Sequence, residues 1–90
     1  MTLRSVNPAD GSLLREYPEA PPAEVAAALA ASARAFEAWH LAPFPERASA
    51  VRRAGAILRE RRDGLARLMA LEMGKPVAQG RAEAEKCAWV

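Results

Sequence analysis

Cysteine and long apolar runs are scarce in this sequence of 90 residues, and each scarcity excludes a class of protein. The single cysteine, Cys87, can form neither an internal disulfide nor a cysteine-rich metal cluster, which suits a reducing compartment. No run approaches the roughly 18 apolar residues of a membrane span, and the N-terminus lacks the charged-then-apolar pattern of a secretion signal. The sequence therefore predicts a soluble, cytoplasmic protein with no membrane partner.

Large apolar side chains are also few. Alanine contributes 22 of the apolar residues and leaves 24 larger ones. Alanine favours helix but buries little surface, and a domain of this size has a small core in any case. The apolar fraction of 51% is nevertheless too high, beside a net charge of +2, for a disordered chain. These figures predict one small, mainly α-helical unit with a thin core.

Turn and helix signals divide the chain into a short N-terminal β-hairpin and three helical segments. The hairpin, over residues 1–18, is centred on Asn7-Pro8-Ala9-Asp10-Gly11, where Asn and Asp accept local backbone hydrogen bonds and Gly takes a positive φ. Two strands alone are marginal in water, so the hairpin needs a surface to lie on. The spacing of apolar residues predicts helices over residues 22–39, 45–73 and 76–90.

The middle helix is too long for a compact body of this size. It would span roughly 44 Å, so it either bends back or lies on something larger. Its apolar period fails at Arg61 and Arg62, which predicts a wobble or a break near residues 61–64 with Asp63 as a new N-cap. The last helix stops at Trp89-Val90 in mid-pattern, so we expect a truncated piece of a larger protein.

Each helix carries an apolar face that needs a partner. With so few large apolar residues, a monomer exposes some of these faces, so we expect self-association, for instance by helix exchange, or packing on the rest of a larger protein. The three faces are Val25, Leu29, Phe36 and Trp39; Val51, Leu58, Leu65 and Met69; and Val77, Gly80, Ala84 and Cys87.

Residues with catalytic or cofactor-binding potential do not assemble into a recognisable site. Gly74-Lys75 lacks the other residues of a phosphate loop and fits a helix C-cap. Cys87 has no base nearby, because the only histidine, His40, belongs to another helix. Glu83 and Glu85 point to different faces of one helix. We therefore predict no catalytic, cofactor-binding or metal-binding residue here, and we interpret Cys87 as a buried or half-buried thiol.

A basic stretch leaves a second interpretation open. Residues 45–75 carry a local charge of +4, and four arginines of this stretch fall within an arc of about 120° opposite the apolar face. Such a face suits a free-standing helical module that binds nucleic acid or an acidic protein. Acidic residues lie among the arginines and no nucleic-acid motif is present, so we favour a solvated or subunit-facing side and predict no nucleic-acid partner. The four are Arg52, Arg53, Arg59 and Arg67.

Blocks of sequence along the whole chain closely resemble the start of the aldehyde dehydrogenase superfamily. They occur in the same order and at similar spacing, and residues 83–90 look most like the succinate-semialdehyde dehydrogenase branch. Pro21 departs from the pattern, because members often carry Thr there as a helix N-cap. The other blocks are Ser5-Val6-Asn7-Pro8-Ala9-Asp10-Gly11, Tyr17-Pro18, Glu24-Val25 through Trp39, Pro45-Glu46-Arg47 through Arg61, and Leu68 to Leu71 followed by Glu72-Met73-Gly74-Lys75-Pro76.

The resemblance implies the N-terminal part of an α/β fold, in which a hairpin and outer helices pack around a cofactor-binding sheet. Complete members are several times longer and oxidise aldehydes with NAD or NADP through a cysteine thiohemiacetal, hydride transfer and glutamate-assisted hydrolysis. Their nucleophilic cysteine, glutamate base, oxyanion asparagine and glycine-rich cofactor segment lie downstream, and no position here matches them. The resemblance thus implies a fragment that is inactive alone and binds no cofactor, with succinate semialdehyde as a candidate substrate of the complete enzyme.

Overall fold

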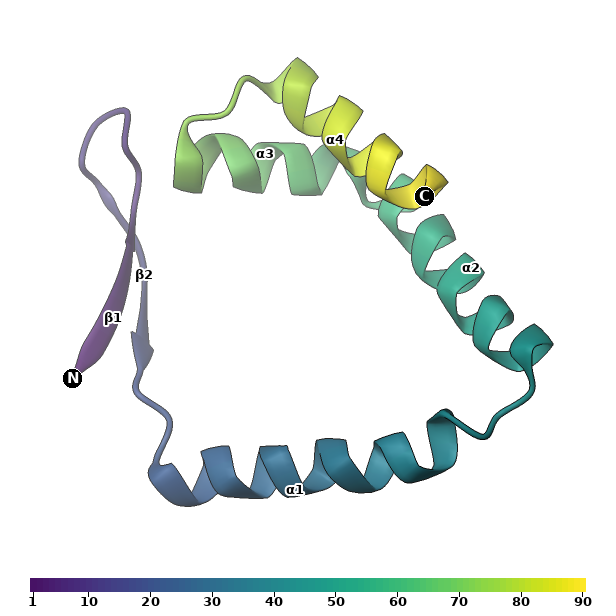
Figure 1. Ribbon diagram of the computed structural model, residues 1–90. Helices are drawn as coiled ribbons and strands as arrows, with labels where there is room; N and C mark the ends of the chain where they lie inside the picture. The colour runs from purple at the N-terminus through teal and green to yellow at the C-terminus, as the bar shows by residue number, and fades with distance from the viewer.

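A computed structural model describes all 90 residues as a two-stranded hairpin followed by four helices. Strands β1 (Thr2–Val6) and β2 (Leu13–Pro18) pair antiparallel. Helices α1 (Pro22–Trp39), α2 (Phe44–Glu60), α3 (Arg62–Met73) and α4 (Val77–Trp89) follow in chain order. In Figure 1 the hairpin, α1, α2 and α3 succeed one another around an open outline, and α4 crosses over the junction of α2 and α3. This is the mainly α architecture with an N-terminal hairpin that the sequence predicts.

The molecule is flat and far more extended than a compact domain. Its radius of gyration is 17.4 Å, whereas a compact chain of this length has one of about 12 Å. Its extents are 48, 36 and 14 Å, and the smallest is little more than the diameter of one helix with its side chains. The only buried apolar side chains are those of Ala66 and Ala84. The chain therefore has no core of large side chains, in agreement with the thin core expected.

The hairpin is closed by the turn chemistry that its sequence predicts. Gly11 takes φ +73° and donates its N–H to the carbonyl oxygen of Asn7 at 2.8 Å. The carboxylate of Asp10 accepts hydrogen bonds from both the hydroxyl and the backbone N–H of Ser12, at 2.7 and 2.9 Å. These two bonds, the hydroxyl bond first, lower the pKa of Asp10. The turn therefore favours the ionised form of Asp10.

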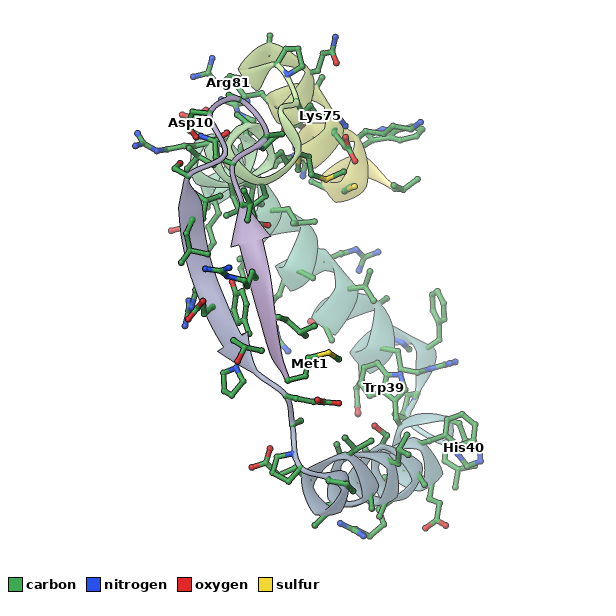
Figure 2. All side chains as sticks on the ribbon, turned by 90° about the vertical axis from the view of Figure 1, so that its left-hand side faces the viewer. Met1, Asp10, Trp39, His40, Lys75 and Arg81 are labelled. Carbon is green, nitrogen blue, oxygen red and sulfur yellow. The ribbon has the colours of Figure 1, made fainter.

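The hairpin rests on the C-terminal end of α3. The hydroxyl of Ser5 donates to the Glu72 carboxylate at 2.8 Å. A Cβ added at Gly74 would lie 3.4 Å from the Pro8 ring, so the turn touches the end of the helix. Figure 2 shows Asp10 at the same end of the molecule as Lys75. This narrow contact gives the hairpin only part of the surface that it needs.

Helix α4 crosses α3 and α2 where the side chains are smallest. A Cβ added at Gly80 would lie 2.9 Å from the Cα of Ala66 on α3. A Cβ added at Gly55 of α2 would lie 2.9 Å from the carbonyl oxygen of Ala88. The contact face of α4 is thus Gly80, Ala84 and Ala88, a spacing of four residues that aligns them along one side. Backbone contact at these points holds the three helices together.

The long helix predicted over residues 45–73 is two helices in the structure. The chain turns at Arg61, which has φ −93° and ψ 7° and lies between α2 and α3. The prediction of Asp63 as the N-cap was wrong, because Asp63 lies inside the first turn of α3 and no side chain caps this helix. Its carboxylate is instead hydrogen-bonded to Arg81 of α4 at 2.8 Å. The break lets α3 turn back under α4, which resolves the excess length of an unbroken helix.

Helix α1 makes little contact with the rest of the molecule. None of its residues is buried, and Leu29 and Phe36 of its apolar face are 68% and 63% exposed. It begins after Pro21 without a side-chain cap, as the sequence predicts. In Figure 1 it runs along the side opposite α3. None of the four helices combines the length and the apolarity required to cross a membrane.

Candidate functional site

The thiol of Cys87 lies on the outer side of α4 and is exposed. It borders a shallow hollow with Glu83 and Lys86. The prediction of a buried or half-buried thiol was wrong, because the contact face of α4 passes through Ala88 instead. The carbonyl oxygen of Ala88 lies against Gly55 of α2. Because Ala88 faces α2, the neighbouring Cys87 faces solvent.

No base is positioned to activate that thiol. The carboxylate of Glu83 is held in an ion pair with Lys75. His40 sits at the C-terminus of α1, where its Nδ1 donates to the carbonyl oxygen of Phe36 at 2.7 Å and its ring stacks on the Phe36 ring. Figure 2 shows His40 at the end of the molecule away from Lys75. The histidine therefore caps its own helix, and the structure does not bring it to Cys87.

Gly74-Lys75 forms a helix C-cap, as its sequence indicates. Gly74 takes φ +70° and donates its N–H to the carbonyl oxygen of Ala70 at 3.0 Å. Lys75 extends the cap through a longer bond to Met69, at 3.4 Å. Its ammonium group pairs with Glu83. The lysine therefore pairs with a carboxylate of the same chain and is not part of a phosphate-binding loop.

The residues present do not fit a nicotinamide dinucleotide. Its phosphates require a cradle of successive backbone N–H groups, for which glycines must lie together in open space. Gly55 and Gly80 are closed off by backbone atoms of neighbouring helices. Gly11 and Gly64 have open space around them but belong to separate elements. No three His, Cys, Asp or Glu side chains gather closely enough to hold a metal ion.

The predicted arginine face is divided between two helices. Arg59 is hydrogen-bonded to Glu85 of α4 at 2.8 Å, which removes it from any free basic surface. Arg67 lies on α3, beyond the break, so it does not continue the line of Arg52 and Arg53 on α2. The expectation of one arc of four arginines was wrong because it assumed an unbroken helix axis. No single basic stripe remains to follow a phosphate backbone.

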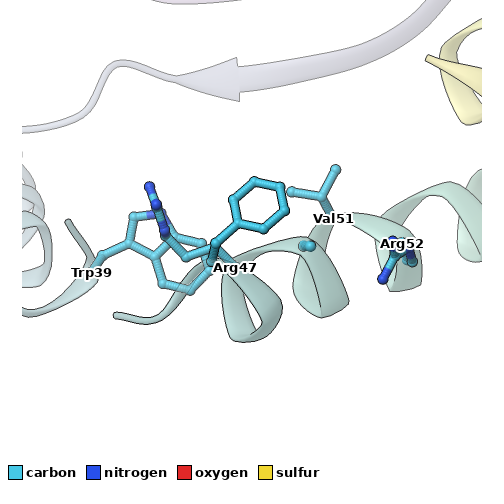
Figure 3. Close-up of a pocket in the computed structure, with 6 residues that line it drawn as sticks. Trp39, Arg47, Val51 and Arg52 are labelled. Carbon is cyan, nitrogen blue, oxygen red and sulfur yellow. The ribbon is translucent and has the colours of Figure 1, made fainter. Parts of the chain in front are cut away.

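The most distinctive surface lies where α1 meets α2. Figure 3 shows an open hollow, the corner hollow, with Trp39 and Arg47 toward one end and Val51 and Arg52 further along α2. The Nε atom of Arg47 is buried and has no hydrogen-bond partner. Neither Arg47 nor Arg52 joins any ion pair of the chain. The lining residues are Trp39, Phe44, Arg47, Ala48, Val51 and Arg52.

Sequence reasoning did not single out the corner hollow. The available signal is the spacing of Phe44, Arg47 and Val51, at steps of three and four, which places an arginine between apolar residues on one helix face. The burial of one nitrogen of that arginine depends on how α1 meets α2. Residues 40–43, which connect the two helices, set the angle between them. This angle produces no periodic pattern in the sequence.

Comparisons with known proteins identify the family. The aldehyde dehydrogenase family profile matches residues 1–90. A probable succinate-semialdehyde dehydrogenase (NADP(+)) of Synechocystis is 39% identical over 90 residues, which are 100% of this chain and 20% of that protein. The succinate-semialdehyde dehydrogenase (NADP(+)) GabD of Escherichia coli is 42% identical over 77 residues, 86% of this chain and 16% of that protein. A glutarate-semialdehyde dehydrogenase of Pseudomonas aeruginosa is 38% identical over 82 residues, 91% of this chain and 17% of that protein.

The match extends along the whole chain but covers little of each relative. The chain spans about a fifth of the length of the Synechocystis protein and slightly less of the other two. Its hairpin and helices follow the order that the sequence blocks predict for the start of such an enzyme. The chain therefore belongs to the aldehyde dehydrogenase family and corresponds to an N-terminal segment of its members.

Proposed function

We propose that this chain is the N-terminal structural segment of an NADP-dependent dehydrogenase that oxidises succinate semialdehyde to the dicarboxylic acid. The observation that carries the proposal is the exposure of apolar side chains in a member of this family. Only two alanines form the buried apolar core, and the whole of α1 is exposed. Faces such as these are built to be covered, so the chain supplies packing surface rather than chemistry.

The substrate and the cofactor are inferred from the relatives. The Synechocystis and E. coli proteins carry succinate semialdehyde and NADP(+) in their names, and the P. aeruginosa protein carries glutarate semialdehyde. These substrates share an aldehyde at one end of a short chain and a carboxylate at the other. In such an enzyme the dinucleotide would supply the hydride acceptor for the oxidation. This chain contributes no group to that step, because its thiol has no base and its glycines form no cradle.

The partner of this segment, in our proposal, is the rest of the dehydrogenase and not a nucleic acid or a membrane. Arg59 and Arg81 are paired with Glu85 and Asp63 across helices, so they reinforce the fold. We place the enzyme in the cytoplasm, since an exposed free thiol such as Cys87 persists in a reducing compartment.

A chimera tests the proposed function. The 90 matched residues of the Synechocystis protein are replaced by this chain, and reduction of NADP(+) is followed with succinate semialdehyde and with glutarate semialdehyde. We expect turnover by the chimera and no turnover above buffer by the isolated chain. The Synechocystis protein without its matched segment serves as the control and should be inactive.

Two outcomes contradict the proposal. One is a folded chimera that turns over neither semialdehyde. The other is activity of the isolated chain that disappears on Cys87→Ser, which would place catalysis within these 90 residues.

A further inference from the structure

We propose that the corner hollow is the docking site for an acidic polypeptide segment of the dehydrogenase outside these 90 residues, whose carboxylate is bound by Arg47. This inference rests on the proposed function, since it names the chemistry by which the segment attaches to the rest of the enzyme. Three observations support it: a buried arginine nitrogen without a hydrogen-bond partner, two arginines without carboxylate partners, and a wall of exposed apolar side chains.

The first observation is the Nε atom of Arg47. It is buried and lacks any hydrogen-bond partner. A buried donor without an acceptor has lost its hydration and gained nothing in return, so native proteins rarely leave one unpaired. Arg47 lines the open hollow, so an acceptor can approach the same guanidinium from outside. An oxygen-bearing group brought by a partner would pair the outer nitrogens of this guanidinium.

The second observation is the charge of the hollow. Arg47 and Arg52 both line the hollow, about 140° apart around α2, and neither has a carboxylate partner. The hollow also adjoins the N-terminal end of α2, which begins after Pro43 without a side-chain cap. The helix dipole adds positive potential at that end. A carboxylate, which an arginine fork binds in a bidentate manner, is the complementary group.

The third observation is the apolar wall. Trp39 is 46% exposed and Phe44 is 72% exposed, and Val51 continues the wall along α2. Tryptophan and arginine together are typical anchors of protein interfaces, where the aromatic ring is covered and the cation is paired. A free inorganic anion would leave these side chains in water. The occupant is therefore a polypeptide that presents an acidic side chain between apolar ones.

The first experiment uses the isolated chain and two peptides. Acetyl-Leu-Glu-Leu-amide and acetyl-Leu-Gln-Leu-amide differ only in the carboxylate, and a Trp89→Phe background leaves Trp39 as the sole tryptophan. We expect the Glu peptide, at millimolar concentration, to shift the Trp39 emission to shorter wavelength, and the Gln peptide to have several-fold less effect. Arg47→Gln should abolish the difference. Arg53→Gln removes the same charge from the same helix outside the hollow, so it should leave the difference intact. Equal responses to the two peptides overturn the proposal.

The second experiment locates the carboxylate in the chimera. Exposed carboxyl groups are coupled to glycine ethyl ester with a carbodiimide and mapped by mass spectrometry. We expect one Asp or Glu in the Synechocystis-derived part to be protected, and to be labelled several-fold more in Arg47→Gln but not in Arg53→Gln. The helicity of the isolated chain should be the same in both variants, which separates docking from a local packing role. Identical labelling patterns in the two chimeras overturn the proposal.

Two further outcomes are informative. If Arg47→Gln dissociates an oligomer of the isolated chain in sedimentation, a second copy occupies the hollow, and the proposal is wrong. If the peptides discriminate as expected but the chimera folds without turnover, the docking chemistry stands and the proposed enzymatic function fails.

Discussion

Asp10 shows at the scale of one residue how the turn sequence sets a measurable property. Its carboxylate accepts two hydrogen bonds from Ser12, which lower its pKa from 3.8. A depressed pKa in the folded state means that ionisation favours the turn. Its contribution is therefore present above the unfolded-state pKa and is lost as pH falls through the folded-state value.

We accordingly expect an NMR titration of the Asp10 carboxyl group, read also at the Ser12 amide, to show a midpoint below 3.8. In Ser12→Ala the midpoint should rise, because the largest cause of the shift, the hydroxyl bond, is removed. A wild-type midpoint at or above the model-peptide value would show that these hydrogen bonds do not persist in solution.

Cys87 provides a second prediction at the residue scale. Because its thiol is exposed on the outer side of α4, the native isolated chain should react with Ellman's reagent at nearly the same rate as the chain in urea. The stoichiometry should be one thiol for each chain. A native rate that is orders of magnitude slower would mean that another copy, or a rearranged α4, covers this surface.

The same residue shows where sequence reasoning stops. The spacing of small residues on the last helix predicts a close contact, and Gly80 and Ala84 are indeed buried. The pattern fits either Cys87 or Ala88 as the next contact, because both lie within half a turn of the same line. The structure places the Ala88 carbonyl against Gly55 of α2, so Ala88 is the residue in contact. The spacing of residues along one helix does not reveal which residue of another helix will contact it.

At the scale of the elements, stability depends on the close contacts of α4 with α2 and α3. A methyl group at Gly80 would meet backbone atoms of α3, which cannot move aside as a flexible side chain would. Gly80→Ala should therefore lower the free energy of unfolding by about 1–3 kcal/mol. At Gly64, inside α3, an added Cβ meets nothing within 4 Å. Gly64→Ala should raise the free energy of unfolding by about 0.5–1 kcal/mol, because alanine is the better helix former.

Urea titrations followed by circular dichroism at the helix band compare these two variants under one condition. They make the same chemical change, so any difference between them comes from the surroundings of each glycine. Equal stability of Gly80→Ala and Gly64→Ala would contradict the close crossing of α4 and α3.

The elements also show how much of the fold is predictable. The hairpin, α1 and the last helix follow from turn residues, prolines and apolar spacing, which act over a few neighbours. The failure of the apolar period at Arg61 gave the position of the break. The direction in which α3 leaves that break is set by long-range contacts, such as the bond of Asp63 to Arg81. For the same reason the sequence misplaced the N-cap and joined four arginines into one face.

At the scale of the whole molecule, the open shape predicts how the isolated chain behaves. Leu29 and Phe36 are seven residues apart on one face of α1 and are largely exposed. In the isolated chain these faces have only one another to cover them, so we expect concentration-dependent self-association in analytical ultracentrifugation. In Leu29→Ser/Phe36→Ser the weight-average mass should fall toward that of the monomer, while Ala31→Ser/Ala38→Ser, with the same spacing on the opposite face of α1, should leave it unchanged. A chain that stays monomeric at every concentration, with α1 still helical, would show that this face does not need a cover.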